Sequence, residues 1–280
     1  FKQKTAYEIM PSLVGSEMCI RDRHEWERLV SNILNPKSTV DICICGKYTA
    51  LKDSYISIRE ALVHAGAHLS IKPNIWFVET TEPEGVADVL SRFQGVIVPG
   101  GFGVRGTEGK IEAIRFAREQ GKPFLGLCFG MQLAVVEFAR NVCKLNQANS
   151  TELNPKTKHP VVCLLPSQRG IKKKGATMRL GAQRVAIKPN TLAARALKAM
   201  VVERRFRHRY EVNPKYVPLL ESKGLVFSGT TPDGKIMQIL ELPKHPFFLA
   251  TQFHPEFTSK LEQPDGFFLE FLKACAEQVN

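Results

Sequence analysis

Short apolar segments alternate with amphipathic helical segments along most of the chain. Strand-length apolar runs occur at residues 40–45, 74–79, 95–98 and 123–127. Apolar residues recurring every three to four positions predict helices at residues 54–65, 86–93, 107–119 and 129–140. Thr107 is the candidate N-cap of the third helix. This alternation predicts a parallel sheet with helices on both faces, and the loops after the strands gathered at one edge.

The pattern changes in the second half of the chain and near its beginning. Shorter strands are predicted at residues 184–187, 225–230, 236–242 and 247–253, with Pro232, Asp233 and Gly234 forming a hairpin turn. Residues 24–34 predict the end of a helix, and residues 35–38 a linker. Residues 1–23 show neither periodicity and are similar to translated sequencing-adapter sequence. We therefore expect residues 1–23 to be non-native.

Composition narrows the class of protein. The chain has 280 residues, 44% hydrophobic and 24% charged, which excludes disordered and fibrous proteins. No apolar run approaches the roughly 18 residues of a membrane span. Seven cysteines are an odd number without a C-x-x-C pair, which favours a reducing compartment and mostly inert thiols. We expect a cytoplasmic protein with no membrane partner.

The net charge is 39 minus 27, or +12, which favours an anionic substrate or a nucleic acid. The excess is concentrated at residues 172–174 and 204–209. The first run contains no aromatic residue, and the second contains only one Phe, Tyr or Trp, Phe206, which is too few to stack a series of bases. We therefore do not expect a nucleic-acid partner.

The strongest chemical signal is Gly126-Leu127-Cys128-Phe129-Gly130, which runs from a predicted strand into a predicted helix. It has the G-x-nucleophile-x-G form, in which the glycines permit a sharp turn that exposes the nucleophile. The turn also places the sulfur at a helix N-terminus, whose partial positive charge favours the thiolate.

A cysteine nucleophile needs a base and a group that orients the base. His254-Pro255-Glu256 follows an apolar strand, and residues two apart on an extended segment face the same side. Glu256 can therefore fix the imidazole of His254 while the other ring nitrogen addresses Cys128. His208 and His245 have no carboxylate at that spacing.

A glycine-rich loop at residues 99–103 directly follows a predicted strand, where its backbone N–H groups could stabilise an oxyanion. Residues 101–106 also match G-x-G-x-x-G, but no acidic residue ends a strand about 20 residues later, so we reject a dinucleotide site. Residues 229–235 have P-loop spacing, but Ile236 stands where a magnesium-binding Ser or Thr is required. We interpret that segment as the hairpin turn.

PGGFG (99–103), GLCFGMQ (126–132) and FHPE (253–256), in this order, resemble the motifs of class I (triad) glutamine amidotransferases. The similarity is closest to the branch that aminates UTP, and covers residues 40–275 almost continuously. It is carried by GKYTALKDSYISIREALVHAG (46–66), QANSTE (147–152), ATMRLGAQ (176–183), RFRHRYEVN (205–213) and QFHPEFTSK (252–260). The resemblance implies a flavodoxin-like, doubly wound, mostly parallel sheet.

The resemblance also implies roles for residues. Cys128 would hydrolyse glutamine through a thioester, with His254 as base and then acid, and Glu256 orienting it. The residues that would hold glutamine or its oxyanion are Gly101, Phe129, Gly130, Met131, Gln132, Glu152 and Arg209. Phe129 replaces the family's usual Leu, a mild change because its backbone N–H has the oxyanion role. The segment at 172–183 resembles a lid that senses GTP, with Thr177 and Arg179 as candidates.

The resemblance implies a larger enzyme around this chain. Residues 24–38 would be the end of an interdomain helix and a linker, residues 39–280 the glutamine amidotransferase domain, and the N-terminal amidoligase domain would be missing. Ammonia would go to UTP, with ATP and Mg²⁺ bound in the missing domain, GTP as effector, no cofactor or metal in this chain, and a homotetramer formed through the missing half. Another triad amidotransferase, such as the GMP synthetase type, and a non-catalytic filament or scaffold subunit are the alternatives.

Overall fold

The computed structural model describes residues 17–47, 49, 51–164 and 178–278. Its helices are α2 (Glu17–Leu34), α3 (Ile56–Leu69), α4 (Val86–Leu90), α5 (Thr107–Glu119), α6 (Phe129–Asn141), α7 (Leu192–Leu197), α8 (Val217–Ser222) and α9 (Gly266–Glu277). Its main strands are β1 (Ser38–Gly46), β2 (Ile71–Glu79), β3 (Gly95–Val98), β4 (Phe124–Leu127), β7 (Arg179–Ile187), β8 (Val201–His208), β10 (Val226–Thr230), β11 (Met237–Glu241) and β12 (Phe248–Thr251). Three further strands are β5 (Ala148–Ser150), β6 (His159–Cys163) and β9 (Glu211–Val212).

The main sheet has a parallel half and an antiparallel half. Its order is β2-β1-β3-β4-β12-β11-β10-β7-β8. The strands from β2 to β12 pair in parallel, and those from β12 to β8 pair in antiparallel. The parallel half has the 2-1-3-4-5 order of flavodoxin-like sheets, which confirms the predicted doubly wound fold. β5, β6 and β9 form a separate small sheet beside α6.

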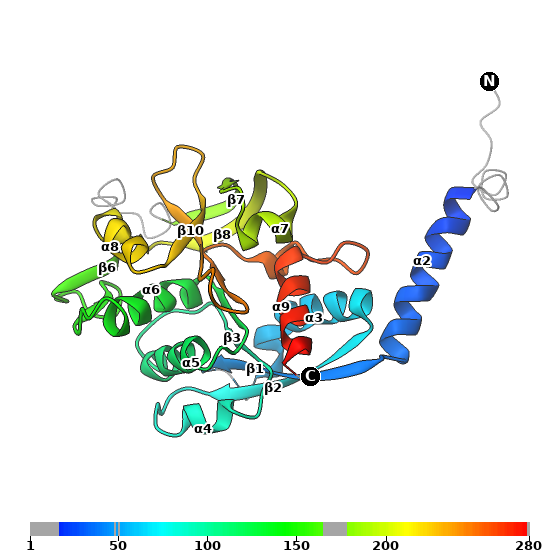
Figure 1. The fold of residues 1–280 in the computed structure, drawn as a ribbon, viewed down its shortest axis with the longest axis horizontal. Coiled ribbons are helices and arrows are strands. Elements are labelled where there is room, and N and C mark those ends of the chain that lie inside the picture. Colours follow the sequence, from blue (N-terminus) through cyan, green and yellow to red (C-terminus); the bar gives the residue numbers. More distant parts are fainter. Residues whose placement is uncertain (1–16, 48, 50, 165–177, 279–280) are drawn as a thin grey trace.

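Helices cover both faces of the parallel half (Figure 1), because alternate residues of each buried strand point to opposite sides. On one face, Val96 and Phe124 pack against α5 and α6. On the other, Ile97 and Leu125 pack against α3 and α9. Because both faces are buried, the strands are continuous apolar runs, and their carboxyl ends meet at one edge.

Helix α2 extends away from the rest of the domain (Figure 1) and contacts it mainly through α3. Leu29 is buried, and Asn32 Nδ2 donates to Ala67 O over 2.8 Å. No helix in the described part of the chain is long and apolar enough to cross a bilayer.

Several predicted boundaries need correction. α2 begins at Glu17, within the segment predicted to be neither helical nor extended. An i,i+4 ion pair between Arg23 and Glu27, at 2.8 Å, supports the helix there. The N-cap of α5 is Gly106 rather than Thr107, because the chain enters the helix with φ of 76°, which glycine adopts without strain. β7 begins five residues earlier than predicted, at Arg179, since it pairs along the whole of β8.

Candidate active site

Cys128 lies at the sharp turn between β4 and α6. Its φ is 52° and its ψ is −99°, a conformation that non-glycine residues rarely adopt. Its N–H donates to Thr251 O at 2.7 Å, which ties the turn to the end of β12. The surrounding structure therefore holds the backbone of a predicted nucleophile in a strained position.

The two glycines that flank Cys128 are required by space. A Cβ atom on Gly130 would lie 2.2 Å from Val98 O, and one on Gly126 would lie 2.7 Å from Ala250 Cβ. The first turn of α6 thus presses directly against the end of β3. This close packing explains why glycine stands at both flanking positions of the G-x-C-x-G pattern.

His254 and Glu256 follow β12 and lie beside the cysteine turn. His254 Nδ1 is 2.8 Å from Glu256 Oε1, and the His254 N–H donates to Arg205 O at 3.0 Å. Burial lowers the pKa of His254, but hydrogen bonds with Cys128 and Glu256 outweigh it and raise the pKa to about 10. The imidazole is therefore arranged to hold a proton between the sulfur and the carboxylate.

The glycine-rich loop after β3 lies next to Cys128 and His254. A Cβ atom on Gly100 would lie 3.2 Å from His254 Cε1 and 3.6 Å from Cys128 Cβ. On Gly101 it would lie 3.9 Å from Phe129 Cδ1. The structure thus places the two residues predicted to supply oxyanion N–H groups, Gly101 and Phe129, next to each other.

Lys47, which the sequence analysis did not single out, supports this loop from the end of β1. Its Nζ donates to Phe102 O and lies 5.0 Å from the centre of the Phe102 ring. Arg105 Nη2 donates to Lys47 O at 2.9 Å. The only sequence signal was a lysine directly after a buried strand.

Glu152 and Arg209, predicted to hold the charged ends of glutamine, lie near each other. Glu152 Oε1 accepts the Gly103 N–H at 3.2 Å. Burial raises the pKa of Glu152, while the Gly103 N–H and the charges of Lys47 and Arg209 act in the opposite direction. A carboxylate and a guanidinium that lie near each other can bind a zwitterionic amino acid.

Met131 and Gln132 lie in the first turn of α6, and both are buried. Gln132 Nε2 donates to Tyr210 O at 2.9 Å. Within the described residues, the buried Gln132 Oε1 has no hydrogen-bond partner. It can accept a hydrogen bond from a bound ligand.

Arg179 has an internal partner. Its Nε donates to the fully buried Glu211 at 2.9 Å, and its Nη1 donates to Gln183 Oε1 at 2.8 Å. Glu211 Oε1 also lies 2.8 Å from His208 Nε2, so His208 has a carboxylate three residues away rather than two. Thr177, the other candidate for the GTP lid, lies outside the described residues.

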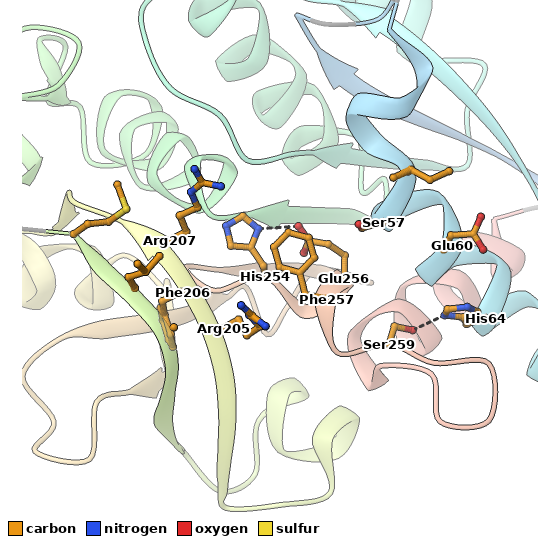
Figure 2. A pocket seen from close by; sticks show the side chains of 14 residues that line it. Ser57, Glu60, His64, Arg205, Phe206, Arg207, His254, Glu256, Phe257 and Ser259 are labelled. Atoms are coloured by element: carbon orange, nitrogen blue, oxygen red, sulfur yellow. Dashed lines mark hydrogen bonds and ion pairs between the residues drawn. The ribbon is translucent and has the colours of Figure 1, made fainter. Parts of the chain in front are cut away.

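A cleft of about 950 Å³ opens on the outer side of His254 (Figure 2). His254, Glu256 and Phe257 form one wall, and Phe257 stacks on the imidazole with ring centres 5.1 Å apart. The remaining walls are provided by α3 and by β7 and β8, with Arg205 and Arg207 on β8. Two of the three catalytic candidates, His254 and Glu256, therefore border this cleft, whereas Cys128 is not among the residues that line it. Across the described ranges, no three His, Cys, Asp or Glu side chains are grouped as metal ligands would be.

Known proteins match this chain over most of its length. The profile of the family Glutamine amidotransferase class-I matches residues 50–274. The CTP synthase of Archaeoglobus fulgidus is 52% identical over 253 residues, 90% of this chain and 48% of that protein. That of Saccharolobus solfataricus is 47% identical over 291 residues, 98% of this chain and 54% of that protein. The chain thus spans about half the length of the curated relatives it matches.

A solved structure is similar throughout the domain. It is the glutaminase domain of Trypanosoma brucei CTPS with bound acivicin, 38% identical, with a TM-score of 0.80, covering 85% of this chain and 94% of that one. The shared fold, the extent of the profile match and the identity to these proteins agree. This chain belongs to the class-I glutamine amidotransferase family.

Proposed function

We propose that this chain hydrolyses glutamine to glutamate and ammonia, with Cys128, His254 and Glu256 as the catalytic residues. The observation that carries the proposal is the meeting of a strained cysteine turn with a half-buried histidine whose Nδ1 lies 2.8 Å from a carboxylate. Glu152 accepts the Gly103 N–H and lies within electrostatic range of Arg209, and the two would bind the ammonium and carboxylate of the substrate.

The proposed reaction has two halves. His254 takes the proton of Cys128, and the sulfur attacks the side-chain amide carbon of glutamine. The oxyanion that forms would accept hydrogen bonds from the backbone N–H groups of Gly101 and Phe129. His254 then gives its proton to the amide nitrogen and the C–N bond breaks. Ammonia departs, and a thioester remains on Cys128.

In the second half, water attacks the thioester while His254 takes one of its protons. The C–S bond breaks, glutamate leaves, and the sulfur recovers its proton from the imidazolium. Glu256 keeps the imidazole oriented in both halves and stabilises the charge that it gains. Gln132 Oε1, buried without a partner among the described residues, would accept a hydrogen bond from the substrate.

We further propose that the complete protein is a CTP synthase, in which this ammonia aminates UTP with ATP and Mg²⁺ bound elsewhere and GTP as effector. The proposal is supported by sequence identities of 52% and 47% to the CTP synthases of two archaea. Residues 39–280 would be the glutaminase domain and residues 24–38 the connection to an amidoligase domain, through which a homotetramer would form. Arg179 and Thr177 remain the candidates for sensing GTP.

The direct test is glutamate release from glutamine by this chain, with and without GTP. We expect release by the unmodified chain, inhibition by acivicin, and loss in Cys128→Ala. Cys143→Ala is the matched control, because Cys143 is half-buried just beyond the far end of α6. Release that persists in Cys128→Ala would refute the assignment. If the folded chain releases nothing, adding the amidoligase half of a CTP synthase separates dependence on that half from a wrong assignment.

A further inference from the structure

Gln252, at the end of β12, directs its side-chain amide at the candidate nucleophile. Gln252 Nε2 lies 3.7 Å from Cys128 Sγ, within hydrogen-bonding distance for sulfur. The side chain is fully buried, so the contact is shielded from water. A glutamine in this position can donate a hydrogen bond to a thiolate but cannot exchange a proton with it.

The orientation of this amide is fixed by a chain of hydrogen bonds that begins at a backbone carbonyl. Tyr210 O can only accept, so the group of Gln132 that faces it, at 2.9 Å, must be Nε2. The same Nε2 lies 3.3 Å from Gln252 Oε1. Gln252 therefore turns its oxygen toward Gln132 and its NH₂ group toward the sulfur.

Backbone hydrogen bonds also hold Gln252 in position. The Gln252 N–H donates to Gln238 O at 2.8 Å, and the preceding carbonyl, of Thr251, accepts the Cys128 N–H at 2.7 Å. Cys128 and Gln252 are thus joined through both backbone and side chain. The amide cannot easily turn away when charge develops on the sulfur.

The sulfur has a second neighbour with the opposite preference. Cys128 Sγ lies 3.9 Å from Arg207 O, which can accept from a thiol but would repel a thiolate. The Gln252 amide favours the thiolate instead, since a donor stabilises the charged form. The two contacts thus make opposite electrostatic demands on the sulfur.

We propose that Gln252 is a further residue of the catalytic site, a hydrogen-bond donor that stabilises and orients the Cys128 thiolate. This inference rests on the proposed role of Cys128 as the nucleophile. It gives the two residues different roles: His254 removes the proton from Cys128, and Gln252 stabilises the negative charge that remains on the sulfur. Gln132 then has two functions, because it would contact the substrate and fix the Gln252 amide.

The test measures alkylation of Cys128 by iodoacetamide from pH 4 to 9, read by mass spectrometry of the peptide that contains it. The reaction needs no glutamine turnover, so its result is separate from that of the glutaminase assay. The variants are Gln252→Leu and Gln252→Met, which keep the volume but remove the donor. Gln238→Leu is the matched control, because Gln238 is a buried glutamine on the adjacent strand with no side-chain hydrogen bond among the described residues.

We expect the pH midpoint of alkylation to rise by about one unit when the donor is removed, since hydrogen bonds to charged groups are stronger than neutral ones. The thiolate fraction at low pH then falls about tenfold. A more basic thiolate is also more nucleophilic, which restores about threefold, so the net rate falls about threefold at low pH and rises about threefold on the high-pH plateau. General loosening of the site would move both limbs in one direction instead.

An unchanged midpoint in folded Gln252→Leu or Gln252→Met would overturn the proposal, and so would an equal shift in Gln238→Leu. If neither variant folds, NMR of the unmodified chain tests the proposal instead. The side-chain amide signals of Gln252 should then titrate with the alkylation midpoint of Cys128, and lose that titration in Cys128→Ala. Signals that do not respond to pH would refute the contact.

Discussion

Lys110 is a buried charge directly beneath the glycine-rich loop, and its replacement by methionine tests how the site is built. The side chain is 2% exposed on α5. Its Nζ lies 5.6 Å from the centre of the Phe129 ring and 3.6 Å from the place where a Cβ atom on Gly101 would be. The ammonium thus lies beside both residues that we propose to supply oxyanion N–H groups.

Burial and the nearby charge of Lys47 lower the pKa of Lys110 from 10.5 to about 8, and the opposing effects of Cys45 and Glu79 are smaller. The difference of 10.5 minus 8 is 2.5, which at 1.36 kcal/mol per pK unit corresponds to about 3 kcal/mol. The cation–π contact with Phe129 offsets roughly 0.5–2 kcal/mol of this cost. Lys110→Met should therefore raise the free energy of unfolding at pH 7 by about 1–3 kcal/mol.

The sign of the pH dependence follows from the direction of the shift. Because the pKa of Lys110 is lower in the folded state, the unfolded chain binds more protons between about pH 8 and 10.5. The unmodified protein should gain stability across that window. The advantage of Lys110→Met should be complete below pH 8 and disappear toward pH 10.5.

Urea unfolding followed by tryptophan fluorescence, at pH 7, 8, 9 and 10, measures this directly. Lys156→Met is the matched control, since Lys156 is exposed and should show no such pH-dependent difference. We also expect glutamate release to slow by on the order of tenfold in Lys110→Met, because a positive charge is removed from beside the developing oxyanion. The reasoning fails if Lys110→Met is no more stable at pH 7, or if its advantage persists at pH 10.

Two further predictions concern how the site is supported. Arg118→Met removes the only cation paired with Glu137 among the described residues; Glu137 is fully buried and 2.8 Å from Arg118 Nη2. Urea unfolding should therefore show a loss of about 3–5 kcal/mol, whereas Arg115→Met, at an exposed position, should change stability by less than about 1 kcal/mol. Gly130→Ala places a Cβ atom 2.2 Å from Val98 O and must displace the first turn of α6. Glutamate release should then fall by about 10² or more, and an active Gly130→Ala protein would contradict the packing.

The parallel half of the fold could be predicted because its sequence carries strong local signals. Buried strands are continuous apolar runs, and each connecting helix has an apolar face of the expected period. The predicted range of α5, 107–119, matches the structure at both ends, and that of β3 does too. Close packing around the cysteine turn demands glycines, so the turn was also visible in the sequence.

The antiparallel half was predicted less completely. β8 was not predicted because its run of arginines obscures the alternation of inward and outward residues: Phe206 and His208 are buried, whereas Arg205 and Arg207 are exposed. α9, which packs on the parallel half, was not predicted either, although its buried residues recur with a helical period: Phe267, Phe268, Phe271, Leu272, Ala274 and Cys275. Only the pairing of β7 with β8 in three dimensions reveals where these strands begin.

The site itself shows why sequence motifs find only some of its parts. Cys128, His254 and Glu256 act through side chains, so their identities and spacing are informative. β8 contributes through its backbone: Arg205 O accepts the His254 N–H at 3.0 Å, and Arg207 O lies 3.9 Å from Cys128 Sγ. A carbonyl is present whatever the side chain, so no residue pattern reports it. The arginine-rich strand thus positions both the base and the nucleophile, and substitutions that shift β8 should disturb catalysis even where they preserve every residue of the triad.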